Sequence, residues 1–168
     1  MAETEKVWYA CYGSNLSADR FKSYIVGEIN PANGIPEKGC TDKSLWTDEK
    51  IRTFPGQLYF ARSSGKWDDG GVAFIDPEAD SMIYMRLYLI TREQYLEVQK
   101  QEGPWYSRCV DLGVAEDGNP IYTFTAAYRY RSNPPSKKYR NWIENALVNE
   151  CGIDKDVAAV YLETAIQK

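Results

Sequence analysis

The residues best suited to chemistry are a short turn motif and one glutamate. The motif Tyr12–Leu16 reads Tyr-Gly-Ser-Asn-Leu and follows the apolar run 7–11. Gly13 tolerates backbone angles that a Cβ forbids, and Ser14 and Asn15 favour turns and caps over regular structure. At the start of a helix, such a turn points several backbone N–H groups at one spot, which suits a carboxylate or phosphate. The motif predicts an anion-binding loop, and an ordinary strand-to-helix turn is the alternative.

The glutamate is Glu102, which is expected at the C-terminal end of a helix because Gly103 and Pro104 follow it as a cap and a breaker. The negative end of the helix dipole opposes a carboxylate there. Its affinity for a proton should therefore rise, and burial would add to the effect. A general acid–base glutamate needs this tuning to act near neutral pH. An exposed helix-end glutamate without a catalytic role is the alternative.

The sequence contains no histidine. Ser–His and Cys–His nucleophile pairs are therefore excluded, together with the commonest metal ligand. Acid–base catalysis would have to come from a carboxylate, Lys, Tyr or Cys. The cysteines at 11, 40, 109 and 151 match no zinc or redox spacing, and Gly-x-Gly-x-x-Gly is absent. The residues therefore indicate no zinc or redox motif and no dinucleotide-binding fold.

Charge and hydropathy narrow the possible partners. A net charge of −4 and a pI near 5.0 leave no basic stripe for nucleic acid, and the densest basic cluster, 137–140, is expected to be a solvated helix face. The polar, acidic start predicts no signal peptide, and no apolar run reaches membrane-spanning length. We expect a cytoplasmic protein with free thiols, no nucleic-acid partner and no membrane contact.

The elements that must position the motif and the glutamate can be predicted from periodicity, caps and breakers. Ser17 is a plausible N-cap, Thr91 with Gln94 forms a capping box, and Gly27 ends the first helix. Strands are predicted at 7–12, 51–62 (bent or interrupted around Pro55-Gly56), 72–75, 82–90, 107–115 and 121–131, and helices at 18–25, 91–101, 137–150 and 155–167. Residues 28–50 are expected to form a long loop, either a lid or an insertion. The pattern indicates one α+β domain over 1–168 with a mixed or largely antiparallel sheet.

Tyr12–Leu16 after an apolar first strand resembles the signature of the γ-glutamylcyclotransferase-like family. Other features follow in the family's order: Trp67 with Gly70-Gly71, the pair Glu102-Gly103, then Tyr106, and Pro134-Pro135-Ser136 before Tyr139. The similarity runs from Tyr9 to about Gly152. The long 28–50 segment departs from the pattern of the compact enzymes, and this departure puts the substrate's identity in doubt rather than the fold.

The resemblance implies a barrel-like sheet flanked by helices and a cofactor-independent enzyme of the acyltransferase or lyase type. Such an enzyme converts a γ-glutamyl amide to 5-oxoproline and a free amine or amino acid. Glu102 would be the catalytic acid–base group. The implied substrate-binding residues are Tyr9, Tyr12, Gly13, Ser14, Asn15, Leu16, Tyr106 and Tyr139. Trp67 is expected to be an ordinary core residue.

Two other functions fit the same residues. A non-catalytic binding or regulatory domain would keep the fold and the anion pocket, since fold alone does not determine function. A related acyl-cleaving enzyme would act on a γ-glutamyl-tagged metabolite. In each case the expected partner is a small molecule, whose leaving amine is left open, and exposed edge strands would permit a homodimer.

Overall fold

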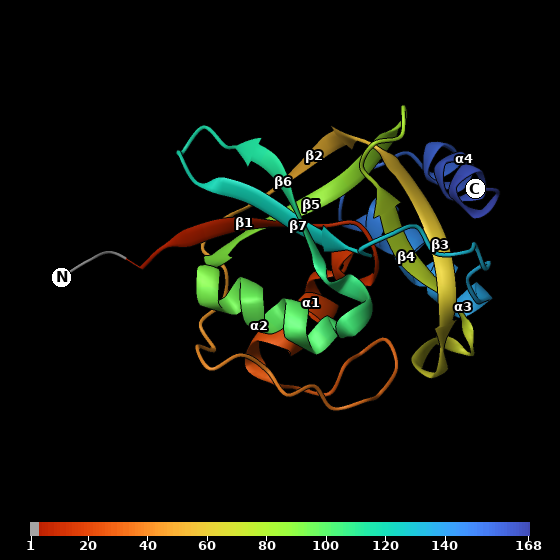
Figure 1. Cartoon of the computed structure of the whole chain (residues 1–168). Helices are drawn as coiled ribbons and strands as arrows, with labels where there is room; N and C mark the ends of the chain where they lie inside the picture. Colours follow the sequence, from red (N-terminus) through yellow and green to blue (C-terminus); the bar gives the residue numbers. More distant parts are fainter. Residues whose placement is uncertain (1–3) are drawn as a thin grey trace.

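The computed structural model describes residues 4–168, which form two sheets and four α-helices (Figure 1). The strands are β1 (Lys6–Cys11), β2 (Glu49–Pro55), β3 (Gln57–Ser64), β4 (Gly70–Asp76), β5 (Met82–Thr91), β6 (Arg108–Val114) and β7 (Pro120–Thr125). The helices are α1 (Ala18–Val26), α2 (Arg92–Glu102), α3 (Lys137–Asn149) and α4 (Lys155–Ile166), with short 3₁₀ turns η1 (Ser14–Leu16), η2 (Gly65–Trp67) and η3 (Pro104–Tyr106).

The larger sheet has the order β2-β5-β1-β7-β6, and β3 and β4 form a separate antiparallel pair. Only the β1–β7 pairing is parallel among the described strands, with Trp8 opposite Ile121. In the antiparallel β1–β5 pairing, Tyr9 lies opposite Tyr88. The predicted α+β class with a mixed, largely antiparallel sheet flanked by helices is confirmed.

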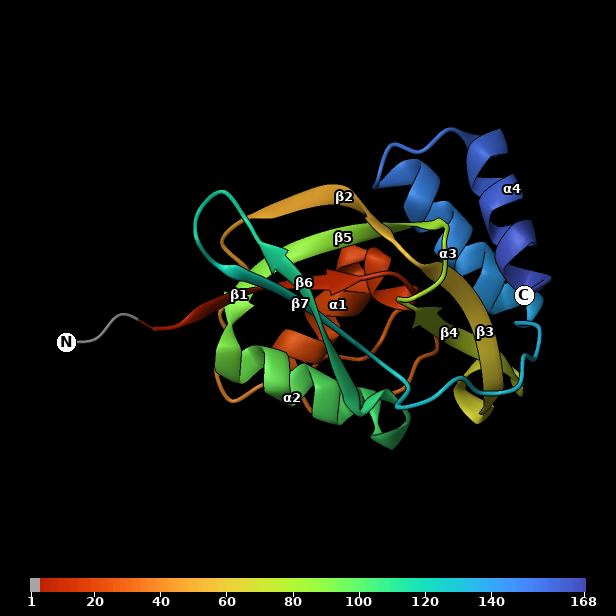
Figure 2. The same cartoon turned by 45° about the horizontal axis from the view of Figure 1, so that its top comes forward.

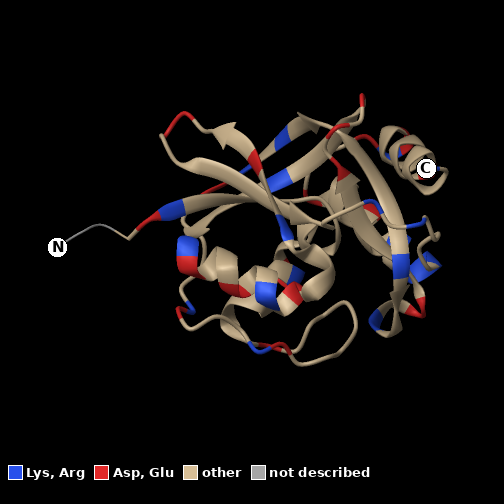
Figure 3. Cartoon of the chain, viewed as in Figure 1, with Lys and Arg blue, Asp and Glu red and all other residues tan. Residues whose placement is uncertain are grey.

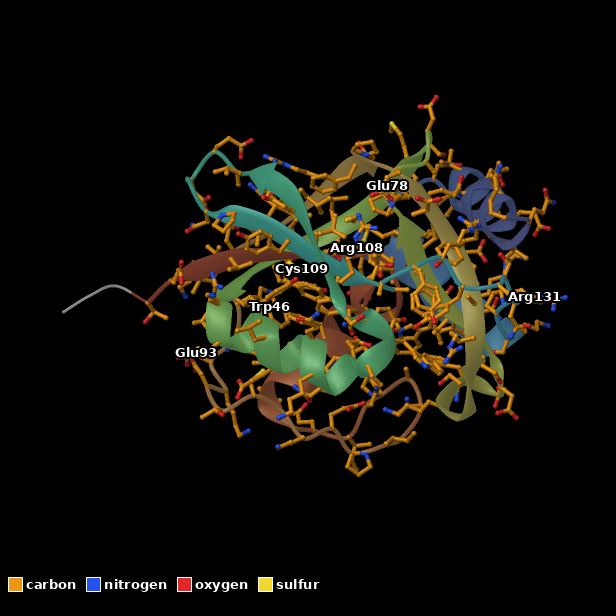
Figure 4. All side chains as sticks on the ribbon, viewed as in Figure 1. Trp46, Glu78, Glu93, Arg108, Cys109 and Arg131 are labelled. Carbon is orange, nitrogen blue, oxygen red and sulfur yellow. The ribbon has the colours of Figure 1, made fainter. Side chains whose placement is uncertain are left out.

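Helices α1 and α2 lie against one face of the larger sheet, whereas α3 and α4 lie beside the β3–β4 pair (Figures 1 and 2). Aromatic rings fill the space between α1, α2 and the sheet. Phe21 of α1 stacks on Tyr88 at 4.2 Å between ring centroids, and Trp46 packs edge-on against Tyr88 from below the sheet (Figure 4). On the next strand Tyr9 stacks on Phe124 at 5.2 Å. The middle of the first strand is thus anchored in an aromatic core.

One predicted strand is interrupted where the sequence indicated, and another ends earlier than predicted. Residues 51–62 form β2 and β3 in different sheets, because Gly56 (φ 137°) turns the chain in a conformation that favours glycine. The predicted strand 121–131 ends at Thr125. Its neighbour β6 begins at Arg108, directly opposite Thr125, so no strand remains beyond that point for β7 to pair with.

The segment 28–48 is irregular, as predicted, apart from one bridge between Ile29 and Pro36, and β2 begins at Glu49. The segment runs beneath α1 and α2 (Figure 1). Hydrogen bonds tie it to α2: Gly39 N donates to the Gln101 side chain at 3.0 Å, and the Gln94 side chain donates to two carbonyls of the segment. It is therefore part of the packed structure around α2.

Within residues 4–168, no helix is both long enough and apolar enough to cross a bilayer. Lys and Arg are interspersed with Asp and Glu around the fold (Figure 3). All four cysteines are free thiols. Residues 1–3, which belong to the polar start for which no signal peptide is expected, lie outside the described part.

Candidate active site

One cavity collects most of the residues that the sequence singled out. It is lined by Tyr9, Cys11, Tyr12, Gly13, Ser14, Asn15, Ala73, Glu102, Tyr106, Phe124 and Tyr139. The lining comes from β1, the turn after it, β4, the end of α2, η3, β7 and α3. Its volume of about 30 Å³ is roughly the share of one water molecule in the liquid.

The observed reason for glycine at position 13 differs from the predicted one, which was its freedom of backbone angles. Gly13 has φ −116° and ψ −133°, so it is not in the left-handed region. A Cβ at Gly13 would instead lie 3.1 Å from the Cβ of Ala73 and 3.2 Å from the hydroxyl of Tyr139. Glycine fits there without a tight contact because β4 and α3 approach the turn closely. Ser17 caps α1 as predicted, accepting a bond from Arg20 N at 3.4 Å.

Three carbonyl groups of the turn accept hydrogen bonds from side chains of the core. The Trp142 indole donates to Ser14 O at 3.1 Å, the Tyr88 hydroxyl to Asn15 O at 2.9 Å, and the Arg86 guanidinium to Leu16 O at 2.8 Å. No described residue accepts a hydrogen bond from the backbone N–H of Gly13, Ser14 or Asn15. Three backbone donors on residues that line the cavity are therefore unused, an arrangement that suits an anionic group.

Glu102 reaches the cavity from the last residue of α2, where Gly103 (φ 101°) ends the helix. The Asn15 side-chain amide donates to Glu102 Oε1 at 2.8 Å and to the Tyr9 hydroxyl at 3.1 Å. Burial away from water raises the pKa of the Glu102 carboxyl, while the Arg20 guanidinium and the Asn15 hydrogen bond act against this rise. A glutamate in such surroundings is suited to exchanging protons closer to neutral pH than an ordinary one.

The cavity's tyrosines remain neutral because burial raises their pKa values. Two hydroxyl protons are already used: Tyr12 donates to Phe124 O at 2.7 Å and Tyr106 to Ala73 O at 2.8 Å. The hydroxyls of Tyr9 and Tyr139 only accept, from Asn15 and from Ala73 N. Their protons are therefore free to be donated to a ligand.

One acceptor is also unused. Asn15 Oδ1 is buried and has no hydrogen-bond partner among residues 4–168. An unpaired buried carbonyl costs free energy unless a ligand or water satisfies it. Asn15 thus offers its backbone N–H to an anion and its side-chain oxygen to a cation.

Two residues named with the motif lie elsewhere. Leu16 is buried in the core and does not line the cavity. Trp67 packs against Tyr139 at 4.7 Å between ring centroids and does not line the cavity either, in agreement with its predicted role in the core.

Sequence reasoning did not single out the lining residues Cys11, Ala73 and Phe124. The period of two along the first strand could have identified Cys11, which lies on the same side as Tyr9. Sequence reasoning also missed Arg20 and Glu37, which lie beside the cavity and change the pKa of the Glu102 carboxyl.

The raised pKa of Glu102 has a measurable consequence for stability. A carboxyl that is more easily protonated when folded favours folding fully below its unfolded pKa of about 4.3. This contribution is lost as the pH rises through the folded pKa. We therefore expect Glu102→Gln to be more stable than the wild type at neutral pH. Urea unfolding should show the difference shrinking as the pH is lowered towards 4. A difference that stays constant with pH would contradict the assigned environment of Glu102.

Comparisons with known proteins come from both sequence and structure. No protein-family model matches the chain. A curated relative, "Histone deacetylase 5" from Arabidopsis thaliana, is 32% identical over an alignment of 207 positions, gaps included. The alignment covers 96% of this chain but 31% of that protein, so the chain spans about a third of its relative's length.

Solved structures show a closer correspondence in shape than in sequence. A γ-glutamyl cyclotransferase superposes with a TM-score of 0.69 at 18% identity, covering 94% of this chain and 86% of the other. An uncharacterised human protein gives 0.67 at 18% identity, covering 98% and 99%. YkqA from Bacillus subtilis gives 0.63 at 16% identity, covering 95% and 55%. The chain therefore has the γ-glutamylcyclotransferase-like fold, which agrees with the resemblance found in its motifs.

Proposed function

We propose that this protein is a γ-glutamylcyclotransferase-type enzyme that converts a γ-glutamyl amide to 5-oxoproline and a free amine. The observation that carries the proposal is the bond from Asn15 to Glu102 beside three unused backbone N–H groups at one cavity. The fold that the chain shares with a γ-glutamyl cyclotransferase supports the proposal. The assignment of an activity rests on the site.

The unused groups of the cavity match the two charged groups on the α-carbon of a glutamyl residue, its carboxylate and its ammonium. The α-carboxylate would accept from the N–H groups of Gly13, Ser14 and Asn15. The α-ammonium would donate to Asn15 Oδ1 and to the Glu102 carboxylate. Because the cavity is smaller than the ~300–1,000 Å³ of ordinary ligand sites, its aromatic walls must move apart when the substrate enters.

The proposed reaction needs no water. Glu102 takes one proton from the α-ammonium, and the resulting amine attacks the γ-carbonyl carbon of the same molecule. A bond forms between the α-nitrogen and the γ-carbon, the amide C–N bond breaks, and Glu102 returns the first proton to the leaving nitrogen. The second proton of the attacking nitrogen then passes through Glu102 to the freed amine, which leaves as an ammonium, while the ring nitrogen keeps one hydrogen. Holding both ends of the glutamyl group in place can supply several kcal/mol of the barrier, since the nucleophile is intramolecular.

The direct test is release of 5-oxoproline from a panel of γ-glutamyl amides whose amine parts differ: amino acids, dipeptides, a polyamine and the lysine side chain. We expect turnover of at least one member. The panel also ranks the leaving groups. A folded protein that releases 5-oxoproline from none of them would contradict the proposal.

A binding or regulatory domain is the second candidate, and one observation favours it. The chain matches a third of a protein whose name describes a different activity. Such a domain would retain a glutamate or 5-oxoproline molecule in the cavity without turnover. Calorimetry with these two ligands, run beside the release assay, separates the candidates because only the enzyme consumes a γ-glutamyl amide.

A further inference from the structure

Behind the Gly13–Leu16 turn lies a buried cation that the proposed reaction does not use. Arg20 of α1 is 3% exposed. Its Nε donates to the Ser14 hydroxyl at 2.9 Å and its Nη2 to the Tyr24 hydroxyl at 2.8 Å. A buried guanidinium is costly unless it is paired. Ser14 lines the cavity, so this cation acts directly on the turn.

The partner of Arg20 comes from the 28–50 segment. Glu37 Oε1 lies 3.6 Å from Arg20 Nη1, and the side chain of Glu37 is 7% exposed. Asn30, itself fully buried, donates to the same oxygen at 3.1 Å. The segment therefore folds so as to hold one carboxylate against Arg20. On its other side Glu37 borders a hollow of about 570 Å³ that also includes Gln101, the neighbour of Glu102.

The two charges act on Glu102 in opposite directions. Arg20 lowers the pKa of the Glu102 carboxyl, and Glu37 raises it. Lys66 is a third charged residue that acts on Glu102, and it lowers the pKa of the carboxyl. The remaining titratable neighbours are Tyr9, Cys11, Tyr12, Tyr24, Tyr106 and Tyr139, which burial keeps neutral.

We propose that Arg20 and Glu37 form a positioning pair. Arg20 fixes Ser14 in the substrate turn, and the opposite charges of the pair together act on the Glu102 carboxyl. The 28–50 segment is then a working part of the active site, since it supplies one of the two charges. The inference rests on the proposed role of Glu102 as acid–base group. Neither member of the pair lines the cavity, so each acts through Ser14 or Glu102 and not on the substrate.

The test compares Arg20→Met, Glu37→Gln and the double variant in the full chain. Carbon-13 NMR follows the titration of the Glu102 carboxyl, assigned by its disappearance in Glu102→Gln. We expect the titration midpoint to move to higher pH in Arg20→Met and to lower pH in Glu37→Gln. The double variant, which leaves no unpaired charge and guards against misfolding of Arg20→Met, should lie between them. Midpoints that move in the same direction, or do not move, overturn the proposal.

Lys22→Met and Glu28→Gln are matched controls. These residues form an exposed pair at 3.9 Å between α1 and the start of the same segment, and we expect both to leave the Glu102 titration unchanged. A shift as large as that of the buried pair would mean that the segment acts only through general stability.

Turnover provides a separate readout. In Arg20→Met we expect kcat/KM to fall about tenfold through the lost bond to Ser14. The acid limb of its pH profile should move in the direction of the NMR midpoint. If the wild type turns over no γ-glutamyl amide, the proposed function fails, while the opposite NMR shifts still decide whether the pair controls Glu102.

Discussion

Replacing Glu102 by Gln is expected to lower kcat for 5-oxoproline release by about 10²–10⁴-fold, the usual contribution of a positioned acid–base group. Gln keeps the length of the side chain and an oxygen that can accept the bond from Asn15, now 2.8 Å. It cannot take the proton of the α-ammonium. The loss should therefore appear in kcat, with the fold and ligand affinity largely retained.

Glu93→Gln is the control for this variant. Glu93 lies in the first turn of the same helix, at the end opposite Glu102 (Figure 4), and its replacement should leave turnover unchanged. Circular dichroism and binding of 5-oxoproline would show that Glu102→Gln is folded. Turnover by Glu102→Gln at the wild-type rate would rule out the mechanism and leave the binding domain as the better hypothesis.

Local signals in the sequence predicted the elements around the site because short-range chemistry determines them. The capping box of Thr91 and Gln94 forms as expected at the start of α2. Gly27, in the left-handed region with φ 78°, ends α1. With Gly103 at the end of α2, these caps determine where Glu102 lies along its helix. Its place beside the turn follows from the packing of α2 on β1, which periodicity alone does not determine.

Features that depend on contacts distant in the sequence could not be predicted in this way. The close packing around Gly13 comes from Ala73 and Tyr139, which are 60 and more residues away. The pairing of Arg20 with Glu37 joins a helix to an irregular segment that carries no pattern. The end of β7 is determined by where β6 begins. Such contacts exist only in the folded chain.

Gly71→Ala is expected to be the most damaging single-methyl change at the site's periphery. A Cβ on Gly71 would lie 2.0 Å from the carbonyl oxygen of Asn133. This is a backbone atom, which cannot move away by a change of rotamer. The backbone there is already fixed, because Gly71 N donates to Pro134 O and Asn133 N to Phe60 O, each at 2.9 Å. Overpacking against rigid backbone should cost about 3 kcal/mol of unfolding free energy.

The damage should also reach the cavity. The strained stretch leads into Ser136, which caps α3 by accepting from Tyr139 N at 3.2 Å, and Tyr139 lines the cavity. Gly65→Ala is the matched control, since its Cβ would meet no atom closer than Asp69 Oδ1 at 4.0 Å. Urea unfolding should place that variant within about 0.5 kcal/mol of the wild type. Equal stability of the two variants would mean that the backbone of residues 133–136 can shift at no cost in unfolding free energy. The close approach of β4 would then not hold Tyr139 in place.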